Sequence, residues 1–317
     1  MQLSVIIPCL NAGETIRTQL EALARQHWSG DWEVIVADNG STDDTRSIAA
    51  SYASRIPSLR VVDASQRRGS AYARNAGVRA AHGRSIAFCD ADDEVADGWV
   101  AAIGAALQHH ELVASRFDGS RLNSTKKLGV PQQHGLDRLW YSPFLPHAGG
   151  CGLGVQRGLH ERIGGFDESL PRLMDTDYCI RAQLAGASLH FVPDALVHVR
   201  MRETGRELFR QTRIWARYNT LLHARYKNPG EQVPGAWRLY WGEWIKLAWA
   251  VPKLRRRDGR LWWMSRLGWQ VGMLQGSIAY RLPPIVFLPR TRPAHEPAPE
   301  SSAGGSAGAL GDQAALR

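Results

Sequence analysis

Residues 85–97 read SIAFCDADDEVAD, in which an apolar stretch is followed at once by acidic residues. The first part, SIAFCD, has the length and composition of a buried strand. Four carboxylates then fall within five positions, at Asp90, Asp92, Asp93 and Glu94. Because like charges this close repel one another, the pattern indicates that the end of the strand binds a positively charged group.

Similar strand patterns alternate with helical patterns on both sides of this stretch. The predicted strands are 3–8, 33–38, 59–64, 85–90 and 189–192, and the predicted helices are 14–26, 41–52, 70–81, 99–108 and 175–185. Apolar strands separated by helices are typical of a parallel sheet that is covered on both faces. The sequence therefore predicts an α/β fold of Rossmann-like type, with a mostly parallel sheet, over residues 1–202.

Polar residues follow the first four predicted strands at the point where each strand ends. Asn11 follows the first, Asp38 to Ser41 the second, Arg67 to Gly69 the third, and Asp90 to Asp93 the fourth. The carboxyl ends of parallel strands meet at one edge of a sheet, where the ligands of such folds bind. We therefore expect these residues to line a single crevice.

The D-x-D pair at this edge suits Mg²⁺ or Mn²⁺, because these hard cations prefer carboxylate oxygens and share the oxygens of a bound phosphate. The alternative is an acidic turn in which one residue, such as Asp93, caps the next helix. Asp38 and Arg74 favour the binding site, since beside the acidic run they supply an acceptor for a base or ribose and a cation for phosphate.

The cysteines Cys9, Cys89, Cys151 and Cys179 form no CxxC pair, and we interpret them as free thiols of a reducing compartment rather than disulfides or metal ligands. The start of the chain, MQLSVIIPCL, lacks the basic n-region of a signal peptide, so we expect a cytoplasmic protein. Cys151 lies in GGCGLGV, which lacks the full G-x-G-x-x-G spacing and is interpreted as backbone on the acceptor side.

Six segments resemble, in order, the inverting family 2 glycosyltransferases of the GT-A fold, which use a nucleotide-sugar donor. They are SVIIPCLNAGETI, VIVADNGSTDDT, GSAYARNAGVRAAHG, IAFCDADD, GGFDE and DTDYCIRAQLAG. The resemblance covers roughly residues 2–202. It implies that Pro8 and Asn11 border the nucleotide site, that Asp38 contacts the base, and that Arg74 lies near the base or the phosphates.

The same resemblance implies that Asp90 meets the ribose and that Asp92 binds the metal ion on the diphosphate. His198 matches a position where some GT-A enzymes carry a metal or diphosphate ligand, although a single histidine is more often structural. The carboxylates of the opening stretch are then explained by a metal-bound diphosphate.

Asp175 matches the catalytic base of the family, and a carboxylate is the group needed to take the proton of an acceptor hydroxyl. The alternative is a helix N-cap, a role that Asp175 or Asp177 could serve. The family commonly has Glu immediately before this base, and this chain has Met174. That departure lies beside the matched base and bears on the class of acceptor.

Residues 203–289 are predicted to form a basic helical extension, and residues 290–317 a disordered tail rich in Pro, Ala, Gly and Ser. From Glu203 to Arg281 there are 15 Lys and Arg against 5 Asp and Glu, and seven of the twelve Trp lie between Trp237 and Trp269. Such a segment suits an anionic membrane surface, or packs on the catalytic domain with its charges solvated. No nucleic-acid-binding motif accompanies it.

The patterns and the resemblance together predict an inverting glycosyltransferase that moves a sugar from a nucleotide diphosphate to a hydroxyl of a glycan or lipid-linked acceptor, in the synthesis of the cell envelope. The protein is expected in the cytoplasm, peripheral to the inner face of the membrane. A non-catalytic nucleotide-sugar-binding or scaffold protein of the same fold is the alternative. A nucleotidylyltransferase is disfavoured, because PCLNAGE is not the Gly-rich signature expected after the first strand.

Overall fold

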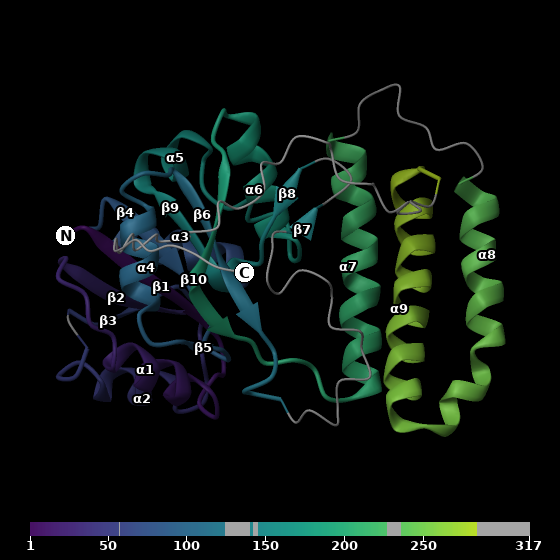
Figure 1. Cartoon of the computed structure of the whole chain (residues 1–317), viewed down its shortest axis with the longest axis horizontal. Helices are drawn as coiled ribbons and strands as arrows, with labels where there is room; N and C mark the ends of the chain where they lie inside the picture. The colour runs from purple at the N-terminus through teal and green to yellow at the C-terminus, as the bar shows by residue number, and fades with distance from the viewer. Residues whose placement is uncertain (57, 124–139, 142–144, 227–235, 284–317) are drawn as a thin grey trace, which may run out of the picture. The chain divides into compact units, whose positions relative to one another are not determined.

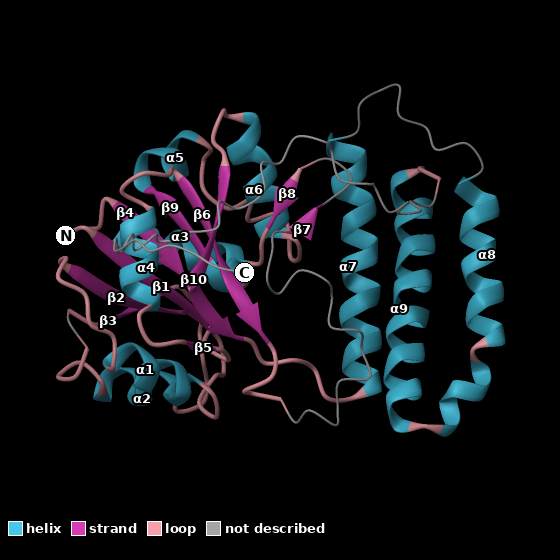
Figure 2. Ribbon diagram, viewed as in Figure 1, coloured by secondary structure: helices cyan, strands magenta, loops and turns pink. Residues whose placement is uncertain are grey.

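The structure of the chain is a computed structural model that describes residues 1–56, 58–123, 140–141, 145–226 and 236–283. The tail predicted over 290–317 lies outside these residues. Among the residues that are described, eight strands form one sheet (Figure 2). Their order is β3 (Arg60–Asp63), β2 (Trp32–Asp38), β1 (Leu3–Cys9), β4 (Ser85–Phe88), β9 (Leu153–Gln156), β6 (Leu112–Asp118), β10 (Leu189–His198) and β5 (Glu94–Val95).

The sheet is mixed, with a parallel half that matches the prediction. β1 pairs in parallel with β2 and β4, and β2 pairs in parallel with β3. β9 runs antiparallel to both β4 and β6, β10 is parallel to β6, and the short β5 is antiparallel to β10. The predicted α/β fold is confirmed, and β9 and β5 add the antiparallel pairings that the sequence reading did not include.

Helices cover the sheet on both faces. They are α1 (Ile16–Ala24), α2 (Thr45–Ser51), α3 (Ser70–Ala80), α4 (Trp99–Ala106), α5 (Arg157–Arg162) and α6 (Met174–Leu184). Successive side chains of a strand point to opposite faces. Val5 and Ile7 accordingly belong to a core shared with α1, α2 and α4, whereas Ile6 belongs to a core shared with α3, α5 and α6. Both faces of β1 are therefore buried, which explains its continuous apolar sequence.

The ten predicted elements all exist, and the largest differences lie at their ends. The helix predicted over 41–52 begins at Thr45, because the preceding Asp43 accepts hydrogen bonds from the backbone and hydroxyl of Thr45 and holds those residues in a loop. The last predicted strand, 189–192, continues to His198. A small second sheet joins β7 (Trp140–Tyr141) to β8 (Pro146–His147), and a 3-10 turn, η2, spans Gly150–Gly152.

The C-terminal helices are α7 (Gly205–Tyr226), α8 (Ala236–Trp249) and α9 (Arg257–Tyr280), with a 3-10 turn, η3 (Val251–Arg255), before α9. Figure 1 shows α9 lying between α7 and α8. Three glycines four residues apart let α9 approach α7 closely, because a Cβ at Gly268, Gly272 or Gly276 would come within 2.1 to 2.6 Å of α7 atoms. No described helix has both the length and the apolar character required to cross a bilayer.

The described residues, which end at 283, form one compact unit that includes these helices. The boundary at 202 between a catalytic domain and a helical extension therefore stays a prediction.

Candidate functional site

The loops that follow the parallel strands are tied together by side chain to backbone hydrogen bonds. The backbone N–H of Asn11 donates to Ser41 Oγ at 2.9 Å, and the backbone N–H of Thr42 donates to Asn11 Oδ1 at 2.8 Å. Asn11 has a φ of 49°, a left-handed conformation that Asn tolerates better than most residues. Pro8, just before it, lies opposite Ala37 in the pairing of β1 with β2. The ends of these two strands therefore form one edge, as predicted.

Asp38 lies at the end of β2 with its side chain fully buried. The backbone N–H of Ser41 donates to it at 3.2 Å, and the guanidinium of Arg46 lies 3.9 Å away. The next residue, Asn39, accepts a hydrogen bond from the backbone of Gly69 at 2.8 Å and so fixes the start of α3. This arrangement holds Asp38 rigidly at the edge where the sequence predicts contact with the base.

Arg74 projects from α3 and forms an ion pair with Asp90, which follows β4. The guanidinium is almost completely buried and lies 5.7 Å from the ring centre of Phe166. Its Nε has no hydrogen-bond partner among the described residues. Burial raises the pKa of the Asp90 carboxyl, Arg74 opposes that rise, and the charges of Asp92 and Asp175 add to it. The backbone of Gly150 lies against the Arg74 guanidinium and also donates to Asp175, so Asp175 lies near the Arg74–Asp90 pair although it is distant in sequence.

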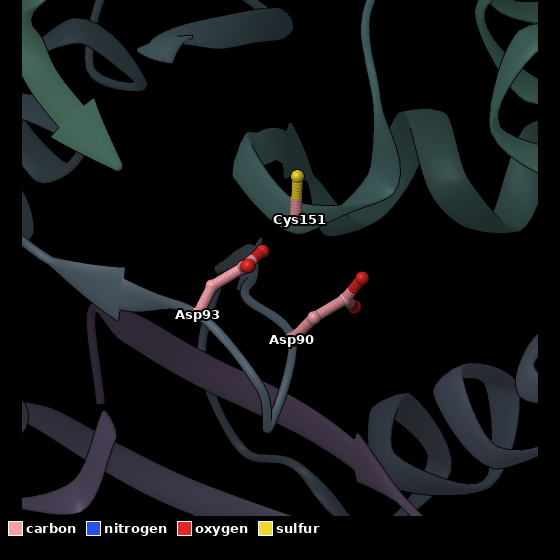
Figure 3. Close-up of side chains that lie close together, drawn as sticks. All are labelled: Asp90, Asp93 and Cys151. Carbon is pink, nitrogen blue, oxygen red and sulfur yellow. The ribbon is translucent and has the colours of Figure 1, made fainter. Parts of the chain in front are cut away.

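Asp90 and Asp93 point toward Cys151 on the turn η2 (Figure 3). Their potential ligand atoms all lie within 4.8 Å of one another. Burial raises the pKa of Asp93 well above its usual range, and the charges of Asp90 and Asp92 raise it further. Burial and the charges of Asp93 and Asp90 raise the pKa of the Cys151 thiol, which keeps it protonated. The site thus holds carboxylates whose mutual repulsion a cation would relieve.

Asp93 is not a helix cap, so that interpretation is wrong. Its Oδ1 accepts a hydrogen bond from the backbone N–H of Arg200 at 2.8 Å, and the next helix, α4, begins only at Trp99 after Gly98. The sequence near Asp93 could not reveal this role, because its hydrogen-bond partner, Arg200, lies in the segment that follows β10. Asp93 therefore joins the acidic run to the far end of the sheet.

Asp92 and His198, the predicted metal ligands, lie in different local surroundings. The Asp92 side chain is about one third exposed, and Arg202 approaches its carboxylate at 3.9 Å. His198 is buried at the end of β10, with its Nδ1 3.0 Å from Asp118 Oδ2. A carboxylate on one ring nitrogen fixes the ring and leaves the other nitrogen for a ligand, a pattern common at metal sites. Their roles as ligands remain predictions.

Asp175 lies in the first turn of α6, where its two oxygens have separate backbone donors. The N–H of Gly150 donates to Oδ2 at 2.9 Å, and the N–H of Thr176 donates to Oδ1 at 2.9 Å. The N-cap position belongs to Leu173, which makes no side-chain cap. The alternative in which Asp175 or Asp177 caps this helix is therefore wrong. Met174, the residue before Asp175, is buried in the core beneath α6.

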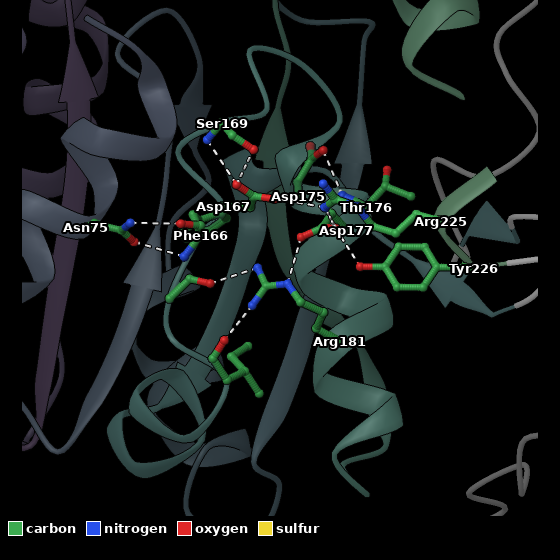
Figure 4. A network of polar contacts seen from close by, with 12 residues as sticks. Asn75, Phe166, Asp167, Ser169, Asp175, Thr176, Asp177, Arg181, Arg225 and Tyr226 are labelled. Carbon is green, nitrogen blue, oxygen red and sulfur yellow. Dashed lines mark hydrogen bonds and ion pairs between the residues drawn. The ribbon is translucent and has the colours of Figure 1, made fainter. Parts of the chain in front are cut away.

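Asp177 instead anchors a buried network that Figure 4 shows. One oxygen accepts from Arg181 Nε at 2.7 Å, and the other accepts from Arg225 and Tyr226 at the end of α7. Arg225 also pairs with Asp167 at 2.8 Å. This network joins the helix of Asp175 to the C-terminal helices.

The contacts that two segments make with the site, the turn around Cys151 and Arg200, were not predicted from the sequence. The turn around Cys151 was assigned to acceptor-side backbone, yet it places a thiol beside two carboxylates, and the backbone of Gly150 binds Asp175. Arg200 contacts the backbone of Asp92 and the side chain of Asp93. The available signal was the basic run HVRMR directly after the last strand. All four cysteines are free, as predicted.

Comparisons with known proteins agree with this geometry. The family model described as glycosyl transferase family 2 matches residues 4–164. The chain is 45% identical over 94 residues to the uncharacterized glycosyltransferase YibD of Escherichia coli, a match covering 30% of this chain and 27% of that protein. It is 28% identical over 228 residues to the glycosyltransferase AglE of Haloferax volcanii, covering 67% of this chain and 71% of that one.

Solved structures share the fold at low identity. The mannosyltransferase PcManGT of Pyrobaculum calidifontis, in complex with GDP-Man and Mn²⁺, superposes with a TM-score of 0.63 at 21% identity, over 87% of this chain and 86% of that chain. TarS of S. aureus in complex with UDP-GlcNAc superposes with a TM-score of 0.54 at 18% identity, over 89% and 93% of the two chains.

Proposed function

Because the chain belongs to glycosyl transferase family 2, we propose that it transfers a sugar with inversion from a nucleotide diphosphate to a hydroxyl of a glycan or lipid-linked acceptor. The observation that carries this proposal is the proximity of Asp90 and Asp175. The backbone of Gly150 donates to Asp175 and lies against Arg74, the ion-pair partner of Asp90, which brings the start of α6 close to the acidic end of β4. Such a transfer needs a metal-bound diphosphate near one carboxylate, here Asp90, and an acceptor hydroxyl near the other, here Asp175. A role in synthesis of the cell envelope is part of the same proposal.

The acidic residues fit a hard divalent cation, Mg²⁺ or Mn²⁺. Burial raises the pKa values of Asp90 and Asp93, and the charges of neighbouring carboxylates raise them further. A cation would relieve that repulsion, and carboxylates are the ligands these ions prefer. The Cys151 thiol stays protonated and leaves coordination to oxygen. Asp92, with Asp90 beside it and His198 as a further ligand, would hold the ion. When bound, the ion stabilises the charge that develops on the leaving diphosphate.

Asp175 acts as the base that removes the proton of the acceptor hydroxyl. Its two backbone donors, Gly150 and Thr176, fix the plane of the carboxylate and still leave lone pairs on both oxygens. Such pre-orientation is what a general base requires. Asp38, Arg74, Asn11 and Pro8 bind the nucleotide along the edge formed by β1 and β2.

Thermal denaturation with UDP-, GDP- and dTDP-sugars, with and without Mn²⁺, tests the donor and the metal. A bound donor stabilises the native state by mass action, so one sugar nucleotide should raise the melting temperature only with the ion. The Asp92→Ala variant should lose that rise. No rise with any donor, or an unchanged response in Asp92→Ala, would refute the proposed site.

Release of nucleoside diphosphate from the donor tests the base. We expect Asp175→Asn to keep donor binding and to lose turnover by a factor of about 10² to 10⁴. The alternative function, a non-catalytic nucleotide-sugar-binding protein, predicts donor binding without turnover in the unmodified chain. The two functions are distinguishable, because Asp175→Asn lowers turnover only if the unmodified chain is catalytic. In a non-catalytic protein the substitution changes nothing in this assay.

Peripheral association with the inner, cytoplasmic face of an anionic membrane completes the proposal. Trp237, Trp241, Ile245 and Trp249 recur every four residues on α8, and all four are exposed, Trp249 by 82%. Residues at this spacing share one helix face. Exposed basic side chains follow on η3 and α9, at Lys253, Arg255, Arg256, Arg257 and Arg260. Exposed Trp beside clustered positive charge suits the interface of an anionic bilayer.

Flotation with vesicles tests this association. The chain should bind phosphatidylglycerol vesicles and not pure phosphatidylcholine, and Trp241→Ser with Trp249→Ser should abolish binding. Leu184→Ser, which removes an exposed apolar side chain from α6, is the control. Absence of binding to the anionic vesicles, or equal loss in the control, would refute the membrane role.

A further inference from the structure

A pocket of about 320 Å³ lies where the segment before α6 meets α7 and α9. Three arginines line it, Arg172 from that segment and Arg213 and Arg217 from α7. Ile214, Tyr218 and Gln275 complete much of its wall. The lining thus combines strong positive charge with apolar surface and contains no carboxylate.

The three guanidiniums have no carboxylate partner within the part of the chain that the structure describes. Neighbouring arginines differ, because Arg181 and Arg225 both pair with Asp177. Arg213 is only partly exposed, and its buried Nε lacks any hydrogen-bond partner in the described residues. A buried donor without an acceptor is costly, and an anion in the pocket would offset that cost. Arg172 and Arg217 are exposed, so their charges are available to the same anion.

The position of the pocket connects it with the proposed chemistry. Arg172 precedes Asp175 by three residues, in the segment that enters α6 through the left-handed Leu173. Arg213 and Arg217 lie one helical turn apart on α7 and so present their guanidiniums on the same side. A ligand held between the two elements lies beside the start of the helix that carries the proposed base.

We propose that this pocket binds the phosphate or diphosphate group of the acceptor, an inference that rests on the proposed function. Guanidinium groups match phosphate geometry with paired hydrogen bonds, and a group with several oxygens can engage more than one arginine at once. Ile214 and Tyr218 provide apolar contact for a hydrocarbon chain attached to the phosphate. The acceptor is therefore a phosphate-linked molecule, with its sugar hydroxyl directed toward Asp175.

Calorimetric titration of the full chain with geranyl diphosphate, inorganic pyrophosphate and geraniol tests the pocket. The buffer contains EDTA and no donor, so that no metal assists binding. The Arg213→Gln/Arg217→Gln variant removes two positive charges of the pocket. The control, Arg206→Gln/Arg210→Gln, removes two exposed charges from the same helix outside the pocket.

We expect the unmodified chain and the control to bind geranyl diphosphate, and the pocket variant to show at least a tenfold higher Kd. Geraniol should not bind. Pyrophosphate binding as tight as that of geranyl diphosphate would assign the recognition to the phosphates alone, whereas tighter binding of geranyl diphosphate would include the hydrocarbon; both support the pocket. No binding of either diphosphate, or equal weakening in both double variants, would overturn the proposal.

The failure of this inference is distinguishable from failure of the proposed function. The donor-dependent rise in melting temperature with Mn²⁺ depends on Asp92 and not on the pocket, so it should persist in Arg213→Gln/Arg217→Gln. Diphosphate binding in EDTA should in turn persist in Asp92→Ala. Loss of donor stabilisation with retained diphosphate binding would refute the function alone, and the reverse result would refute the pocket alone.

Discussion

Tyr226, the last residue of α7, donates a hydrogen bond of 2.5 Å to the buried carboxylate of Asp177 on α6. Arg225 contacts the same oxygen at 2.8 Å. A carboxylate removed from water is tolerated when its oxygens have charged or strong donors, and here the donors come from the C-terminal helices. α7 is thus required to satisfy a charge two residues from the proposed base, Asp175.

Removal of the Tyr226 hydroxyl should therefore destabilise the fold. A hydrogen bond to a charged group contributes about 1.5 to 3 kcal/mol, so we expect Tyr226→Phe to lower the free energy of unfolding by about that amount. Chemical denaturation measures it. Tyr280→Phe, at the end of α9, is the control. Equal stability of Tyr226→Phe and the unmodified chain would contradict a structural role for this contact.

Stability should fall as the pH decreases from about 6.5 to 4 because of His160. Burial and the charges of Arg157 and Arg181 lower the pKa of this histidine from 6.5 to about 4. In that window the unfolded chain binds a proton that the folded chain does not, so acid favours unfolding. The expected loss between pH 7.5 and 5 is about 2 kcal/mol.

The measurement compares denaturation at the two pH values in the unmodified chain and in His160→Gln. Gln keeps a polar group near the Tyr178 hydroxyl, which lies 2.9 Å from His160 Nδ1, but it does not titrate. The variant should lose less stability on acidification, by about the 2 kcal/mol assigned to His160. If the unmodified chain and the variant showed identical pH dependence, His160 would be protonated equally in the folded and unfolded states.

The sequence was sufficient for the parallel half of the sheet because β1, β2 and β4 are buried on both faces. An apolar run such as that of β1 has few alternatives once helical patterns follow it. β9 has a weaker signal, since Leu153–Gln156 is a short stretch within a Gly-rich segment and its pairing depends on β4 and β6. Motifs singled out Asp90 and Asp175 as candidates for the site. The partner of Asp93 was not, because Arg200 lies 107 positions away.

The seam between α7 and α9 should not tolerate a methyl group at Gly272. A Cβ there would lie 2.1 Å from the Arg213 carbonyl oxygen, a backbone atom that cannot move independently. We expect Gly272→Ala to cost about 1 to 3 kcal/mol. Gly242→Ala on α8 is the matched control, because nothing lies within 4 Å of its Cβ. It should stabilise the chain by roughly 0.8 to 1 kcal/mol through helix propensity.

Thermal denaturation of the two variants measures this difference, and the sign is the decisive feature. A drop in melting temperature for Gly272→Ala with a rise for Gly242→Ala supports close packing of α7 on α9. Stabilisation by both substitutions would mean that the two helices are farther apart than described.

Arg74 should set the pH at which the acidic site binds its metal ion. Burial and the charges of Asp92 and Asp175 raise the pKa of Asp90, and the buried guanidinium opposes that rise. Loss of the guanidinium in Arg74→Met would leave the pKa of Asp90 higher. Metal binding needs the ionised carboxylate, so the midpoint for Mn²⁺ uptake should move to higher pH. Arg74→Lys keeps the charge and should move it less.

Calorimetric titration with Mn²⁺ alone over a series of pH values separates this effect from any loss of nucleotide contacts. Weaker donor binding in Arg74→Met at every pH, with an unchanged Mn²⁺ midpoint, would mean that Arg74 contacts the donor and does not control Asp90. If the Mn²⁺ midpoint moves to higher pH in Arg74→Met and stays close to normal in Arg74→Lys, the positive charge at position 74 controls Asp90. Met and Lys differ little in length, so the two variants differ mainly in charge.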